Sequence, residues 1–169
     1  MPHMDRKNLY SVTFSDIECS GVAKRDVFEI QGSTNTRVRL HRVKLSQHTI
    51  LTGSSERVSV EVLTGGTSTA VGGVVGVVNR FLDKGATALC QATYNSTTAG
   101  SSGGLEVLRE AENWTVGAEQ DFIYEPASDK RIQSGLNEQM TVRLGINAAN
   151  MGISGSIVWE EIGKIPGES

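Results

Sequence analysis

The amino-acid sequence predicts an all-β fold, a jelly-roll-like β-sandwich of about eight strands with little helix. Apolar side chains alternate with polar ones along most of the chain, which is the period of a strand and not of a helix. The apolar segments are short, and many of the 19 glycines in 169 residues fall between them, where tight turns need them. Many short strands with turn signals between them are typical of a sandwich or barrel, and about eight strands in two sheets favour the jelly roll.

The clearest strand signals lie in the N-terminal part of the chain. In residues 10–14, tyrosine, valine and phenylalanine alternate with serine and threonine, and residues 28–30 suggest a short second strand. In residues 37–47 the apolar phase slips by one residue in the middle of the segment. A β-bulge near His41 and Arg42 would account for this slip.

Turn signals and low-complexity sequence divide the rest of the chain. The alternation in residues 58–62 ends in a Thr-Gly-Gly-Thr turn, and residues 87–94 alternate weakly. Residues 95–104, rich in serine, threonine and glycine, are predicted to form an exposed, mobile loop. Residues 105–114 fit one or two helical turns and a strand equally well, so both alternatives stay open. The remaining strands are predicted at residues 122–124, 140–146 and 153–159.

The chain is predicted to form one domain, because 169 residues favour a single hydrophobic core and no composition shift divides them. Residues 1–8 are assigned to a polar N-terminal arm, residues 9–163 to the β-sandwich and residues 164–169 to a C-terminal tail. The arm and the tail are candidates for reaching a neighbouring protein, although frayed ends are common in any chain. Cys19 and Cys90 are predicted to be free, buried thiols, because a domain of this size needs no disulfide and a cytoplasm keeps thiols reduced.

Charge and hydropathy argue against two classes of partner. Nineteen acidic and 16 basic residues give a net charge of -3, which offers no general attraction to a phosphate backbone, so we expect no nucleic-acid partner. The longest apolar stretch, residues 71–78, is interrupted by glycines and is far shorter than the ~20 residues that cross a bilayer. We therefore expect no membrane association. The polar N-terminal segment lacks the apolar core of a secretory signal, which predicts synthesis in a cytoplasm.

The sequence contains patterns that resemble catalytic or metal sites, but the residues around each pattern do not support such a site. Residues 100–104 match the Gly-x-Ser-x-Gly nucleophile pattern, but a Ser/Gly-rich tract stands where a strand, a turn and a helix would be needed to expose the serine. His41 and His48 are too few and too far apart for a zinc or iron site, so a cupin-like enzyme would lack its metal ligands. Glu160 and Glu161 are adjacent, and in a strand they point to opposite faces and cannot flank one substrate bond. We expect no enzymatic activity, no cofactor and no metal.

Four cations, Arg37, Arg39, Arg42 and Lys44, fall on one predicted strand, mostly opposite its apolar side. One interpretation is a solvated edge strand whose charges discourage unwanted strand pairing. The other is a charged contact with a neighbouring protein, in which electrostatics would set the register. These four residues are the candidate protein-contact site.

Several segments resemble small proteins encoded among the virion structural genes of tailed bacteriophages. The resemblance covers about half of the chain, and the middle of the chain, residues 64–102, matches no pattern of the family. It is carried above all by Ser154–Gly163 and also by Leu9–Phe14, Asp26–Ile30, Val38–Leu45, Phe122–Pro126, Arg131, Ser134 and Met140–Leu144.

Proteins of this kind are similar to the jelly-roll decoration, or cement, proteins on the outside of capsids. The resemblance implies a homo-oligomer with a trimer favoured, a partner in the major capsid protein or another virion protein, and a place on the outer capsid surface after synthesis in the cytoplasm of the bacterial host. It transfers no site residue. The alternative is a tail or host-recognition module that binds surface carbohydrate or another tail protein. Carbohydrate binding would need an exposed aromatic side chain, for which Trp114 is the candidate.

Overall fold

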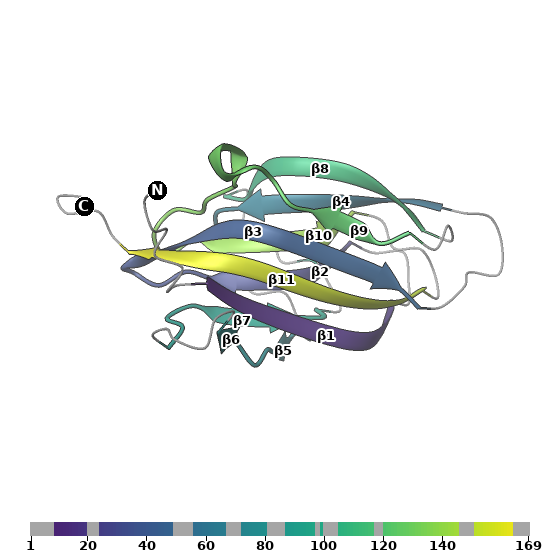
Figure 1. The fold of residues 1–169 in the computed structure, drawn as a ribbon, viewed down its shortest axis with the longest axis horizontal. Coiled ribbons are helices and arrows are strands. Elements are labelled where there is room, and N and C mark those ends of the chain that lie inside the picture. The colour runs from purple at the N-terminus through teal and green to yellow at the C-terminus, as the bar shows by residue number, and fades with distance from the viewer. Residues whose placement is uncertain are drawn as a thin grey trace, which may run out of the picture.

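The computed structural model describes most of the chain and forms two antiparallel sheets that face each other (Figure 1). The residues described are 9–19, 24–48, 56–66, 72–80, 87–96, 99, 105–116, 120–145 and 151–163. The predicted arm (residues 1–8) and tail (residues 164–169) lie outside them. The strands are β1 (Leu9–Cys19), β2 (Arg25–Gln31), β3 (Thr36–Gln47), β4 (Glu56–Thr64), β5 (Val74–Val75), β6 (Asn79–Arg80), β7 (Gln91–Tyr94), β8 (Val107–Val116), β9 (Phe122–Tyr124), β10 (Gln139–Leu144) and β11 (Met151–Gly163), and one 3-10 turn, η2, covers Ser128–Lys130.

The strand order is that of a jelly roll. The five-stranded sheet, called sheet A, has the order β6-β1-β11-β3-β9, and the six-stranded sheet, called sheet B, has the order β5-β7-β2-β10-β4-β8. When the short strands β5, β6 and β7 are set aside, β1-β11-β3-β9 faces β2-β10-β4-β8, which is the double Greek key of the jelly roll. The predicted all-β jelly-roll sandwich is therefore confirmed, and residues 107–116, left open between helix and strand, form β8.

The connection between β4 and β8 adds the three short strands. β5 and β7 extend sheet B beside β2, whereas β6 extends sheet A beside β1. Residues 72–80 are thus bonded to both sheets along one side of the sandwich. Gly76 allows the close approach, because a Cβ atom there would lie 2.8 Å from a methyl group of Val12, and its amide donates to the carbonyl of Ala92 at 2.9 Å.

The core lies between the two sheets and follows the predicted alternation. Tyr10 and Trp159 pack against each other with ring centroids 6.1 Å apart, and the Phe14 ring contacts Phe28 at 5.1 Å. Gly155 of β11 faces inward beneath Phe14, and a Cβ atom there would lie 2.8 Å from the ring. Cys19 and Cys90 are free and buried, as predicted. Burial raises the pKa of both thiols and keeps them protonated.

The predicted bulge in β3 is confirmed. Arg42 pairs with Val158 of β11, and Leu40 pairs with the next residue, Trp159, so His41 is the extra residue. A second bulge, in β1, was not predicted: the register shifts between Phe14 and Ile17. Asp16 in this bulge has a positive φ of 51°.

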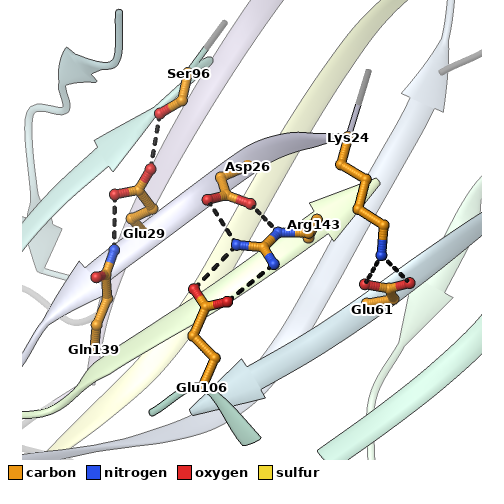
Figure 2. A network of polar contacts seen from close by, with 8 residues as sticks. All are labelled: Lys24, Asp26, Glu29, Glu61, Ser96, Glu106, Gln139 and Arg143. Atoms are coloured by element: carbon orange, nitrogen blue, oxygen red, sulfur yellow. Dashed lines mark hydrogen bonds and ion pairs between the residues drawn. The ribbon is translucent and has the colours of Figure 1, made fainter. Parts of the chain in front are cut away.

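The outward side of the central strands of sheet B is also buried, and polar groups cover it (Figure 2). Arg143 of β10 lies between two carboxylates: its Nη2 is 3.2 Å from Asp26 Oδ2 and 3.0 Å from Glu106 Oε1. Burial would lower the pKa of Arg143, but its hydrogen bonds and charge interactions with the two carboxylates outweigh burial and raise the pKa. The guanidinium therefore stays charged.

A second buried carboxylate completes this network. Glu29 of β2 accepts hydrogen bonds from the Ser96 hydroxyl at 2.8 Å and from the Gln139 amide at 2.7 Å. Ser96 is buried, so the part of the predicted exposed loop (residues 95–104) that the structure places here is not exposed. Ser96, within that tract, and Glu106, just after it, are both held against sheet B by polar contacts (Figure 2).

We predict that Arg143→Met lowers the free energy of unfolding by about 3–5 kcal/mol, because it leaves the buried Asp26 carboxylate and the partly buried Glu106 carboxylate without their cation. Urea denaturation of the purified variant measures the change. The matched control is Lys24→Met, since Lys24 pairs with Glu61 at 3.4 Å with its side chain 55% exposed. That exposed pair contributes about 1 kcal/mol or less, and equal losses in the two variants would contradict the prediction.

Candidate interaction face on sheet A

The four predicted contact cations lie on the outer face of sheet A. They project from β3, on the side opposite the buried Val38, Leu40, Val43 and Leu45. β3 lies between β11 and β9, so it is not an edge strand. The interpretation of these cations as protection of a solvated edge is therefore wrong, because β3 pairs with β11 along one side and with β9 and Gln133 along part of the other.

Three of the cations form ion pairs with acidic side chains on or next to the neighbouring strands. Arg39 lies 3.5 Å from Glu160 of β11. On the other side, Arg42 Nε lies 3.8 Å from Glu125 and Lys44 Nζ lies 2.7 Å from Asp121. We call this row of pairs across β11, β3 and the β9 region the ion-pair ladder.

The ladder makes the face polar but locally neutral. Hydrogen bonds from Lys44 and Ser46 lower the pKa of Asp121, so its carboxylate is ionised over a wide pH range. Arg37 lies on the same side of β3, near the end of the strand. These pairs are solvent-exposed and each is weak, so a partner protein can exchange them for pairs of its own at little cost.

His41, the bulge residue, lies inside a cluster of charges on this face. Its Nε2 is 3.2 Å from Glu160 Oε2 and 3.4 Å from Arg131 Nη1. One nitrogen cannot donate to the carboxylate and accept from the guanidinium at the same time. Desolvation lowers the pKa of His41 and the nearby Arg131 and Arg39 charges lower it further, against the opposing effect of Glu160. The neutral ring accepting from Arg131 is thus the favoured state near neutral pH.

Small hydroxyl side chains leave an open hollow next to the ladder. Its volume is about 180 Å³, and it is lined by Lys44, Ser46, Ser154, Gly155 and Ser156. His48 Nε2 contacts the Ser154 hydroxyl close by. The hollow offers one cation and three hydroxyl groups that can donate or accept hydrogen bonds, which suits a polar group of a partner.

The structure places the two adjacent glutamates as the alternation predicted. Glu160 faces outward in the ladder, whereas Glu161 faces inward and is buried. Its carboxylate accepts the backbone amides of Leu89, at 3.0 Å, and Cys90, at 2.9 Å. Sequence analysis placed Glu160 and Glu161 on opposite faces but missed this role, in which Glu161 anchors the segment that leads into β7.

Trp114, the predicted carbohydrate-stacking residue, is not on the surface. It is 3% exposed, packs near Phe122 and donates its indole N–H to the carbonyl of Gln120 at 2.9 Å. Trp114 therefore does not provide the exposed aromatic side chain that the carbohydrate-binding alternative would need, because it lies on the inward side of β8 opposite Val58. Within the described ranges, no cluster of three or more His, Cys, Asp or Glu side chains could hold a metal ion.

Comparison with known proteins gives no relative: no family model, no curated protein and no solved structure matches this chain. A search of the described residues for a helix long and apolar enough to span a membrane finds none.

We predict that acid weakens the fold through His41. Because its folded-state pKa lies below its unfolded value, His41 contributes stability above the unfolded pKa of about 6.5, and this stability is lost as pH falls through the folded pKa. Replacing it by asparagine (His41→Asn) removes this term, so the free energy of unfolding falls less steeply between about pH 7.5 and pH 5. Urea denaturation at each pH measures how steeply the free energy of unfolding changes with pH.

The matched control is His48→Asn, which removes an exposed imidazole and leaves His41 with its partners in place. The pH-dependent loss assigned to His41 persists in this control. Identical slopes for the wild type and His41→Asn would refute the assignment.

Proposed function

We propose that the protein is a non-enzymatic structural component of a bacteriophage virion, which decorates the outer capsid surface and stabilises it by bridging capsid subunits. The observation that supports this most is where the family-like segments fall. They lie in β1, β3, β9 and β11, which together form all of sheet A except the short β6, and in β2 and β10 of sheet B. The resemblance thus concerns the main strands of the jelly roll and the polar outer face of sheet A.

The outer face of sheet A is suited to docking on a protein lattice. Its backbone is fixed by pairing on both sides of β11 and β3, so the charged groups are held in a constant pattern. A flat, rigid, alternately charged face sets register by electrostatic complementarity without needing a deep pocket. When one decoration unit contacts several capsid subunits, weak contacts act together as a multivalent clamp.

The partner in this proposal is the major capsid protein or another virion protein, and the protein acts as a homo-oligomer. The alternative is a tail or host-recognition module. The hydroxyl-lined hollow beside Lys44 favours that alternative, because such groups bind sugar hydroxyls. All aromatic side chains among the described residues are buried or half-buried, however, and stacking on a sugar ring needs an exposed one.

Imaging of virus particles with and without the protein tests the proposal. We expect regularly spaced density over the capsid when the protein is present, and reduced resistance of the head to heat when it is absent. Heads of unchanged appearance and stability, together with lost adsorption to host cells, would instead support the tail module.

Charge reversal on β3 tests the docking face. We predict that the double variant R42E/K44E binds capsids at least about tenfold more weakly than the wild type, because two exchanged ion pairs of about 1 kcal/mol each are lost and like charges oppose each other. The wild-type affinity falls as salt rises, since exposed pairs are screened. Sedimentation of capsids with labelled protein measures the affinity of the double variant and the salt dependence of the wild-type affinity.

The control is Lys24→Glu, which reverses an exposed cation attached to sheet B. We expect it to bind capsids like the wild type. Attachment that is insensitive to salt and unchanged in R42E/K44E would exclude the outer face of sheet A as the docking site.

A further inference from the structure

Exposed apolar side chains are concentrated at the two free edges of sheet B. At one edge, Val74 and Val75 of β5, together with Val77 and Leu89, form what we call the β5 strip. At the other edge, the β8 strip consists of Leu105, Val107 and Leu108. Of the large hydrophobic side chains exposed in the described residues, only Ile123 lies elsewhere.

The two strips lie at opposite ends of the same sheet, because β5 and β8 are its first and last strands (Figure 1). Among the described residues, each of these strands has a hydrogen-bonding partner on one side, and their backbone groups along the other side are available for pairing. The first seven residues of β8 are exposed on both faces. An edge strand of this kind, with apolar side chains beside it, is a template for strand addition by another chain.

The charges of the two edges are complementary. β8 carries Glu110 and Glu112, both exposed, and Arg109, whose Nε donates to the Thr64 hydroxyl of the neighbouring β4 at 2.7 Å. Residues 72–80, which contain the three valines of the β5 strip, carry Arg80 and no acidic residue. Arg80 is exposed and donates to the neutral Thr87 hydroxyl at 3.4 Å.

In registers centred on the middle of β8, residues 109–112, pairing of β8 with β8 of a second copy is disfavoured by charge. In an antiparallel pair related by a two-fold axis, a register centred on Arg109, Glu110 or Glu112 places that residue opposite itself. A register centred on Ala111 places Glu110 opposite Glu112. Like charges directly opposite each other destabilise a strand pair.

From these observations we infer that the β8 strip of one copy binds the β5 strip of the next, so that the protein associates with itself head to tail. Apolar side chains meet apolar side chains, Glu110 and Glu112 approach Arg80, and both edges gain strand partners. A head-to-tail contact closes into a ring or continues as a filament, and it uses two different surfaces of each copy. The trimer that the family resemblance implies is one closed form of this contact.

The test is the mass of the purified full-length protein by size-exclusion chromatography with light scattering. We expect the wild type to be oligomeric and the variants Val75→Lys and Leu108→Lys to be monomeric. The matched control, Ile123→Lys, changes a side chain that is 51% exposed, close to the 61% of Val75 and the 55% of Leu108, but that lies on sheet A. We expect it to keep the wild-type mass.

Mixing the two monomeric variants distinguishes this contact from a two-fold one. V75K keeps an intact β8 strip and L108K keeps an intact β5 strip, so an equimolar mixture forms heterodimers through one intact contact. A monomeric wild type, an oligomeric V75K or L108K, or a mixture that stays monomeric would each overturn the inference.

Circular dichroism checks that the variants fold. If V75K or L108K does not fold, Val74→Lys and Val107→Lys provide a second pair of variants at the same two edges. The assay contains no virus particle, so its outcome is independent of whether the protein binds capsids.

Discussion

The fold depends on the pairing of β11 with two partners from the other end of the chain. β11 lies between β1 and β3, and thirteen residues at the C-terminal end of the sandwich fix the register of both. Because these contacts join distant parts of the chain, sheet A forms only when both ends of the domain are present, which is the long-range pairing typical of a jelly roll. The same pairing holds Arg39, Arg42 and Lys44 at fixed spacing beside their acidic partners.

The two sheets differ at their outer faces, and in our proposals this difference gives them different roles. On sheet A the outward side chains include hydroxyls and exposed ion pairs, which water or a partner can contact. On sheet B the outward side of β2 and β10 is buried under a network centred on Arg143 and Glu29 (Figure 2). Among the described residues, the two edges of sheet B remain open. A molecule built in this way can use one face for a foreign surface and two edges for copies of itself.

The sequence predicted those parts of the fold in which burial imposes a period. The bulge at His41 was predictable because inward side chains on both sides of it made the phase slip visible. β8 was not predictable from the sequence, because its first seven residues are exposed on both faces and show no alternation of apolar and polar side chains. The roles of Glu161 and Arg143 depend on partners far away in the chain, and a single charged residue on a strand gives no sign of being buried. The cations of the candidate site were identified, but their acidic partners were not, since strand order alone brings Glu160 and Asp121 beside them.

The ion-pair ladder reconciles a highly charged face with a reversible contact. Unpaired cations would repel one another in the free protein and would attract any acidic surface. Paired across strands, they present alternating charges, so only a partner with the opposite pattern gains energy by exchange, and a mismatched partner meets like charges. The strength of each exchanged pair is small. Firm attachment therefore requires several copies acting together, which is why self-association at the edges of sheet B and docking through sheet A would reinforce each other.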